Sequence, residues 1–109
     1  MYSTILFTAP DSESSRRISK KLLKLKLVAC ANIFPIDSIY WWKSEIVEEK
    51  EYAVLLKART QDFDEIKRAI LEDHTYDIPC IVRYDIIKGH APYLEWIKES
   101  TYRSQTTRK

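Results

Sequence analysis

Alternating apolar and polar residues between positions 28 and 58 predict two β-strands joined by a tight turn. The first strand, roughly Val28 to Trp42, is rich in the β-branched and aromatic residues that suit a half-buried sheet. The second strand, roughly Glu45 to Ala58, places Tyr52, Val54, Leu56 and Ala58 on one face and Glu51, Ala53, Leu55 and Lys57 on the other. Each strand has about 14 residues, whereas about 5–6 is usual. The turn lacks an Asn-Gly or Asp-Gly pair, so the sequence does not predict its type.

The far end of this predicted ribbon is strongly apolar, with Ile39, Tyr40, Trp41 and Trp42 in succession. An isolated two-stranded ribbon is marginal in water, and exposed aromatic surface favours association. We therefore expect the ribbon to pack on another copy of the chain, with Tyr40, Trp41 and Trp42 at the interface. The alternative is base stacking, as in ferredoxin-like RNA-binding proteins. Those proteins carry their aromatics on central strands beside a glycine-bearing motif, which this chain lacks, so we expect no nucleic-acid partner.

The rest of the chain alternates strand and helix patterns. Apolar runs predict strands at 3–9 and 80–87, and apolar residues spaced by three and four predict helices at 14–26 and 60–73, with a short helix around 93–97. Asp11 or Ser12 is the expected N-cap of the first helix, and Asp62 with Glu65 a capping box for the second. Pro35 predicts a bulge or bend in the first long strand. The order β-α-β-β-α-β is the ferredoxin-like α+β arrangement, an antiparallel sheet with two helices on one face.

Length and composition indicate one globular domain, which we place at residues 1–101, followed by a polar, basic tail at 102–109. The net charge of +2 does not point to a nucleic-acid partner. A single glycine, Gly89, excludes a Walker loop and a dinucleotide-binding fingerprint. Because no set of nucleophile, base and orienting residue stands out, we expect no enzymatic activity and assign no catalytic residue.

The two cysteines, Cys30 and Cys80, lie among apolar residues and are expected to be buried thiols in a reducing compartment. The first residues show neither the basic segment nor the apolar run of a signal peptide. No apolar run reaches the length of about 18 residues that a membrane-spanning helix needs. We therefore expect a cytoplasmic protein with no membrane partner.

Five stretches, spread in order over most of the chain, resemble the CutA family of divalent-ion (copper) tolerance proteins. They are Thr8-Ala9-Pro10-Asp11, Leu27-Val28-Ala29-Cys30-Ala31-Asn32-Ile33, Ile39-Tyr40-Trp41-Trp42, His74-Thr75-Tyr76-Asp77-Ile78-Pro79 and Tyr93-Leu94-Glu95-Trp96-Ile97. The resemblance implies a homotrimer of ferredoxin-like protomers whose long strands reach across to neighbouring subunits. It also implies a likeness to trimeric PII signalling proteins, and weak binding of Cu(II) or another divalent cation with no organic cofactor.

The metal site proposed for that family uses a first-strand cysteine and two histidines before a Pro-Tyr pair. The matching positions here hold Phe7, Asp73 and His74, so only His74 agrees. Imidazole and carboxylate groups are ligands for first-row metals, and His74 with Asp73 is therefore the candidate metal site. The alternative for His74 is a hydrogen-bonded loop residue. The family usually has glycine where Ser44 stands, so we expect the turn to differ here.

The second hypothesis is a PII-like trimeric sensor or scaffold that binds a small molecule or partner in a cleft between subunits. The residues expected to line that cleft are Tyr76, Lys57, Trp42 and Trp96. His90, next to Gly89, is expected to be an exposed turn residue with no role in either site.

Overall fold

The computed structural model describes residues 1–103, so most of the predicted tail, residues 104–109, lies outside the described residues. The elements follow the predicted order, with ends that differ by a few residues and one added 3₁₀ turn. They are β1 (Tyr2–Ala9), α1 (Ser12–Lys24), β2 (Cys30–Trp42), β3 (Glu45–Arg59), η1 (Thr60–Asp62), α2 (Phe63–Asp73), β4 (Ile81–Ile86) and α3 (Ala91–Ser100). None of these helices is both long and apolar enough to cross a membrane.

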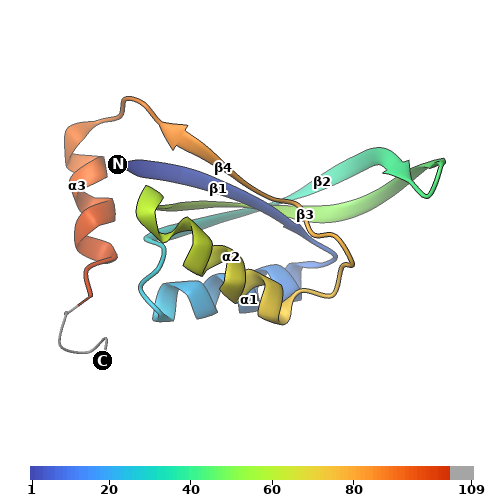
Figure 1. Cartoon of the computed structure of the whole chain (residues 1–109), viewed down its shortest axis with the longest axis horizontal. Coiled ribbons are helices and arrows are strands. Elements are labelled where there is room, and N and C mark those ends of the chain that lie inside the picture. The colour runs from blue at the N-terminus through green and yellow to red at the C-terminus, as the bar shows by residue number, and fades with distance from the viewer. Residues whose placement is uncertain (104–109) are drawn as a thin grey trace.

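The strands form one antiparallel sheet in the order β2-β3-β1-β4. Helices α1 and α2 lie on one face of the sheet, and α3 lies across one end (Figure 1). This confirms the predicted ferredoxin-like α+β fold. Strand β1 ends at Ala9, opposite Tyr52, and beyond that point β2 and β3 continue as a two-stranded ribbon. The ribbon makes the chain elongated, with a radius of gyration of 14.9 Å, where about 13 Å is typical of a compact chain of this size.

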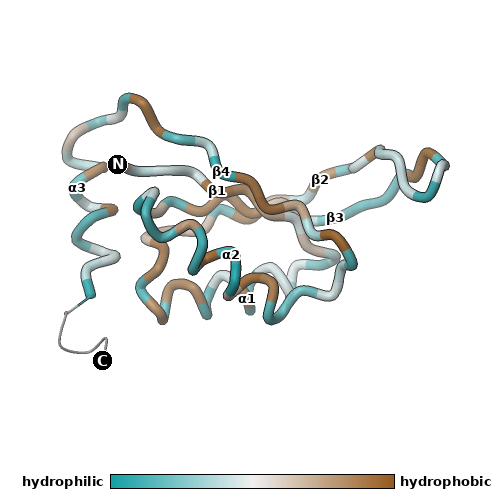
Figure 2. Tube along the Cα trace, viewed as in Figure 1, coloured by the Kyte–Doolittle hydropathy of each residue, from teal (hydrophilic) through white to brown (hydrophobic). Residues whose placement is uncertain are grey.

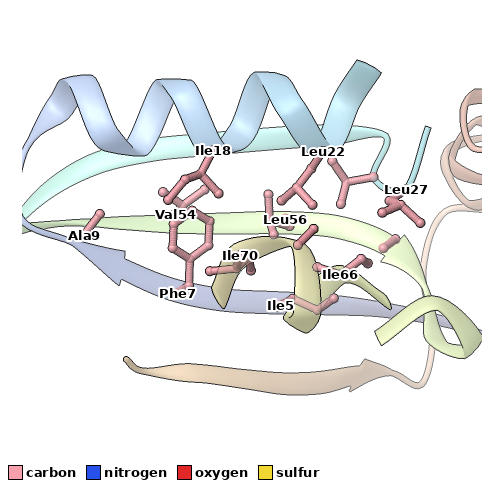
Figure 3. Packing of buried hydrophobic residues seen from close by; sticks show 13 residues of the cluster. Ile5, Phe7, Ala9, Ile18, Leu22, Leu27, Val54, Leu56, Ile66 and Ile70 are labelled. Atoms are coloured by element: carbon pink, nitrogen blue, oxygen red, sulfur yellow. The ribbon is translucent and has the colours of Figure 1, made fainter. Parts of the chain in front are cut away.

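The hydrophobic core lies between the sheet and the two helices that cover it (Figure 3). β1 and β3 contribute Ile5, Phe7, Val54 and Leu56, and the helices contribute Ile18, Leu22, Ile66 and Ile70. All eight side chains are at most 1% exposed. Burial of each such side chain contributes about 1.5–3 kcal/mol, so this layer supplies most of the stability of a single chain.

Both ends of α1 are closed by specific contacts. The carboxylate of Asp11 accepts a hydrogen bond from the Ser14 backbone N–H at 2.7 Å, which confirms Asp11 as the N-cap. Hydrogen bonds from the Ser14 hydroxyl and backbone N–H lower the pKa of Asp11. At the other end, Lys26 donates to Leu23 and Leu27 donates to Leu22, as in a Schellman motif. Lys26 has a φ of 58°, the position that glycine usually takes.

The capping box predicted at Asp62 is wrong, because this carboxylate makes no capping hydrogen bond to α2. Asp62 is buried and instead accepts a hydrogen bond from Arg103 at 2.9 Å, with Arg59 3.7 Å from its other oxygen. Two nearby cations compete better for a buried carboxylate than a backbone N–H does. Arg103 also donates to the Lys26 carbonyl, so the start of the predicted tail is held against the domain.

The ribbon differs from expectation at Pro35, and the structure gives the type of its turn. Phe34, Pro35 and Ile36 pair in continuous register with β3, so the bulge, one of the two alternatives predicted at Pro35, is wrong, and the bend stays a prediction. Since β2 is an edge strand, proline is tolerated there without a bulge.

At the tip, Trp42 pairs with Glu45, and the two residues between them have positive φ angles of 50° (Lys43) and 66° (Ser44). These are the angles of a type I′ turn, adopted here without glycine.

Much apolar surface is left uncovered by the two helices. Ile39, Trp41 and Ile46 share one face of the ribbon and are 65%, 71% and 65% exposed. In Figure 2 the ribbon shows short hydrophobic stretches among pale and hydrophilic ones. On the sheet face opposite α1 and α2, Phe34 and Tyr84 are also exposed. Single exposed apolar residues are common, whereas several on one face are typical of interaction surfaces.

Candidate functional site

A cleft of about 910 Å³ runs along the ribbon from its base toward its tip, beside the loop that joins α2 to β4. We call it the ribbon cleft, and its lining residues are Thr8, Asp37, Ser38, Ile39, Tyr40, Trp41, Trp42, Glu49, Glu51, Tyr76, Asp77, Ile78 and Cys80. Four of these are acidic, four are aromatic, and none is Lys, Arg or His. The cleft therefore combines apolar walls with negative charge.

Strand register explains why these residues meet. Ser38 opposes Glu49, and Tyr40 opposes Val47, on the paired strands β2 and β3. Because alternate residues of a strand share a face, Tyr40 and Trp42 lie on the same face as Glu49 and Glu51. This face continues the side of the sheet that α1 and α2 leave open. The cleft forms there because β1 ends at Ala9 and no third strand follows the ribbon among the described residues.

Two carboxylates of the cleft are bonded by tyrosine hydroxyls. The Tyr76 hydroxyl donates to Glu51 at 3.0 Å, and the Tyr40 hydroxyl donates to Glu49. Burial and the bond to Glu51 raise the pKa of Tyr76, and the bond to Glu49 raises the pKa of Tyr40 to about 12. Both phenols therefore stay neutral near pH 7, and the charge of the cleft comes from its carboxylates. Glu51 is only 7% exposed.

His74 fixes the loop that closes one side of the cleft. Its Nε2–H donates to the Thr8 carbonyl at 2.6 Å, and its Nδ1 accepts from the Tyr76 backbone N–H at 3.2 Å. These partners define a neutral imidazole protonated on Nε2. The ring also packs edge-on against Phe7 and lies 4.7 Å from the Tyr76 ring. In this arrangement one ring nitrogen is bonded to β1 and the other to the backbone of Tyr76.

Asp73, the other residue of the predicted metal site, lies at the end of α2 and forms an ion pair with Lys21 at 3.0 Å. Lys21 also contacts Glu72 at 2.8 Å and the Ala69 carbonyl at 3.1 Å, and these acidic partners raise its pKa. This contact ties α1 to α2. Among residues 1–103, no group of three or more His, Cys, Asp or Glu side chains is close enough to hold a metal ion. Metal binding at His74 and Asp73 thus stays a prediction.

Of the four residues predicted for the cleft, two line it and two lie elsewhere in the single chain. Tyr76 and Trp42 both line the ribbon cleft. Lys57 instead lies opposite Cys30 at the other end of β3, with its ammonium 3.4 Å from Asn32. Trp96 lies on α3 against Tyr93, with ring centroids 5.4 Å apart. A single chain therefore brings together two of the four, and a shared cleft in the assembled protein remains a prediction for the others. His90 is exposed, as expected.

Both cysteines are free, but neither is buried as predicted. Cys30 is half-buried at the start of β2, beside Tyr93 of helix α3. Cys80 is exposed at the edge of the ribbon cleft, just before β4. Partial desolvation and the nearby Glu51 carboxylate raise the pKa of the Cys80 thiol. The prediction of buried thiols rested on the apolar residues beside each cysteine in the sequence. In the structure those residues do not bury either thiol.

Sequence reasoning did not assign Glu49 and Glu51 to the site. A signal was present for Glu51, because the alternation of β3 places it on the same face as Ala53, which is also buried. An acidic residue at a buried position needs a polar partner, and that partner is Tyr76. The partner comes from a loop 25 residues away, so the pattern of one strand could not reveal it.

Comparison with known proteins relates the whole fold to one family. Residues 3–100 match the family described as CutA1 divalent ion tolerance protein. The divalent-cation tolerance protein CutA of Archaeoglobus fulgidus is 41% identical over 100 residues, covering 92% of this chain and 98% of that protein. The corresponding protein of Pyrococcus horikoshii is 43% identical over 94 residues, covering 86% of this chain and 92% of that protein.

Solved structures agree with the sequence matches. A structure described as the periplasmic divalent cation tolerance protein CutA from A. fulgidus superposes with a TM-score of 0.92 at 40% identity, covering 94% of this chain and all of that one. The divalent cation tolerance protein of Thermus thermophilus superposes with a TM-score of 0.90 at 39% identity, again covering 94% of this chain and 100% of that one. The chain belongs to the CutA1 divalent ion tolerance protein family.

Proposed function

We propose that this protein acts in divalent-cation tolerance as a PII-like homotrimer that binds its ligand in the ribbon cleft. It is a binding protein in this proposal, without catalytic activity. The observation that carries the proposal is the ribbon itself, which has exposed apolar residues on one face and a cleft along it. The functional unit is the domain at residues 1–101, with 102–109 as an appended tail.

The exposed ribbon supports the assembly. Ile39, Trp41 and Ile46 are all at least 65% exposed in one chain, on one face of a two-stranded ribbon. Burying apolar surface of this kind stabilises by about 25 cal/mol per Å², and one large aromatic side chain buries about 150–250 Å². Packing the ribbon on a neighbouring subunit would recover that stabilisation three times in a trimer. Tyr40, Trp41 and Trp42 would then lie at or near the subunit boundary.

The hydrogen bonds of His74 favour the cleft over a copper site at His74 and Asp73. A copper ion would have to displace one of the two bonds that hold the imidazole, and the Asp73 carboxylate is already paired with Lys21. The ribbon cleft needs no such rearrangement. Its volume also lies within the range of about 300–1,000 Å³ that is usual for small-molecule sites.

Thermal unfolding with added ligand separates the two sites, because a bound ligand stabilises the folded state in proportion to its occupancy. A small-molecule library and Cu(II) are each tested against the native protein, Glu51→Gln and His74→Ala. Binding in the cleft predicts library compounds whose stabilisation is lost in Glu51→Gln. A copper response that His74→Ala abolishes, with no compound that depends on Glu51, would overturn the proposal in favour of the metal site.

The proposed compartment is the cytoplasm. Its support is that both cysteines are free. Cys30 begins β2, whereas Cys80 directly precedes β4. The A. fulgidus relative is described as periplasmic, so the compartment needs a direct test. Fractionation of the native host, with marker proteins for each compartment, should recover the protein with the cytoplasmic markers. Recovery with periplasmic markers would contradict this part of the proposal.

A further inference from the structure

One exposed face of helix α1 carries a row of positive charges, which we call the basic stripe. Its residues are Arg16, Arg17, Lys20 and Lys24, and all four are exposed. The opposite face of α1 packs in the core, so the helical period directs these side chains outward. Glu13 is the only acidic residue of α1, and it pairs with Arg17 at 3.3 Å. No ion pair among residues 1–103 involves the other three side chains of the stripe.

Helix α2 lies beside α1 on the same face of the sheet, and its charge has the opposite sign (Figure 1). Its charged residues are the acidic Asp64, Glu65, Glu72 and Asp73 and the basic Lys67 and Arg68. Where the helices meet, Glu72 and Asp73 are paired with Lys21 of α1. Lys67 contacts the Phe63 ring, which also contacts Arg83 of β4, so Lys67 faces away from α1. The positive surface is therefore about one helix wide.

This narrow width decides which kind of anionic partner fits. A membrane or a nucleic-acid duplex is wider than one helix and would also meet the acidic side chains of α2. A single nucleic-acid strand is narrow, but its binding depends on stacking on aromatic side chains, and α1 has none. Leu23 and Leu25 border the stripe instead and are 38% and 49% exposed. Basic and apolar side chains together favour a peptide that carries both carboxylates and apolar groups.

The spacing of the stripe matches an extended peptide. Arg16, Lys20 and Lys24 follow one another at four-residue steps, which is about 6 Å along a helix. In an extended chain, alternate side chains share a side and lie about 6.6–6.8 Å apart. We propose that the basic stripe binds an extended acidic segment of a partner protein, whose alternate carboxylates lie beside these three residues. This surface is separate from the ribbon cleft, so the inference goes beyond the proposed function and does not depend on it.

Labelled peptides in which glutamate or glutamine alternates with alanine test the charge requirement. Fluorescence anisotropy with the native protein at low ionic strength measures their binding. The glutamate peptide should bind at least about tenfold more tightly than the glutamine peptide, because several exposed charge pairs act together. Its affinity should fall as salt is added, since salt screens exposed charges. Equal binding of the two peptides would overturn the inference.

Matched pairs of lysine variants locate the surface. Lys20→Gln combined with Lys24→Gln should weaken binding of the glutamate peptide by about fivefold or more. Glutamine is a good helix former, so α1 is retained. The control combines Lys67→Gln with Lys88→Gln, which removes two exposed lysines outside the stripe and should change the affinity by less than about twofold. Equal losses in the two double variants would reveal a general charge effect and refute the assigned surface.

Two further measurements test the choice of partner. Oligothymidylate with the same number of charges, and vesicles of phosphatidylserine and phosphatidylcholine, should each bind more weakly than the glutamate peptide. Equal or tighter binding of either probe would replace the peptide by a nucleic acid or a membrane. The mass of the Lys20→Gln, Lys24→Gln protein in solution should equal that of the native protein. A loss of assembly in this variant would show that the stripe contacts a neighbouring subunit, and the inference would fail.

Discussion

Strand β3 passes through two environments that differ in almost every respect. Its second half lies under α1 and α2, where Val54 and Leu56 are fully buried. Its first half belongs to the ribbon, where Ile46 is 65% exposed and β2 is the sole neighbouring strand among the described residues. This first half carries four glutamates and Lys50, and its apolar residues are Ile46 and Val47. One chain accounts for the packed half, whereas we propose that a neighbouring subunit covers the exposed apolar residues of the ribbon.

The largest effect on the free energy of unfolding is expected in the core. Leu56→Ala should lower the free energy of unfolding by about 2–5 kcal/mol, because it removes a fully buried side chain and leaves a cavity. Denaturant titration measures the change. Leu71→Ala on α2 is the control, since Leu71 is about half exposed and should change stability by no more than about 0.5 kcal/mol. Similar losses in both variants would contradict the assigned core.

The ribbon should respond in the opposite way, with little change in the fold and a large change in assembly. Replacing Trp41 and Ile46 together by serine should weaken subunit association by at least about tenfold, because both are exposed in one chain and buried in the proposed trimer. Sedimentation at several concentrations measures association, and far-UV circular dichroism monitors folding. Leu25→Ser, on the helical side, should leave the assembly intact. An unchanged assembly in the double variant would show that the ribbon is not the interface.

High pH should affect both regions, through groups whose folded-state pKa is raised. Lys21 joins α1 to α2, while Tyr40 and Tyr76 bond the carboxylates of the cleft. Because the folded state holds these protons more tightly, their stabilisation is complete below the unfolded pKa values near 10 and is lost as pH rises through the higher folded values. Stability should therefore fall between about pH 9 and about pH 12.

Tyr76→Phe separates the contribution of the cleft from that of the helices. This variant lacks the phenol that titrates, so its stability should be lower near neutral pH and should fall less steeply at alkaline pH than that of the native protein. Urea unfolding across the pH range measures both slopes. An identical slope in the variant would mean that the raised pKa of Tyr76 does not contribute to stability.

The smallest expected effects come from two residues with a positive φ angle, one at the end of α1 and one at the tip of the ribbon. Lys26→Gly at the end of α1 and Ser44→Gly at the ribbon tip should each raise the free energy of unfolding by about 1 kcal/mol, because glycine adopts positive φ without steric cost. Lys24→Gly is the matched control, since Lys24 is helical and glycine there should destabilise by about 0.5–1 kcal/mol. The same sign at positions 24 and 26 would contradict this interpretation.

The order of elements, the length of the ribbon and the helix cap at Asp11 were all predictable, because each depends on residues close together in the sequence. Other features were not. The partners of Asp62 and Glu51 come from Arg103 and Tyr76, which folding alone brings near. Of the bulge or bend expected at Pro35, the bulge is absent, because the outer backbone groups of an edge strand need no partner in the sheet. Local patterns therefore predicted the scaffold, while the site depends on contacts between distant segments.

The mass of the native protein in solution tests the central claim most directly, since the ribbon is proposed to require neighbouring subunits. Light scattering coupled to size-exclusion chromatography, repeated over serial dilution, gives that mass without a variant or a ligand. The expected result is one species of three chains, each of 12.9 kDa, that persists on dilution. A folded species with the mass of a single chain would contradict the claim that assembly covers the ribbon.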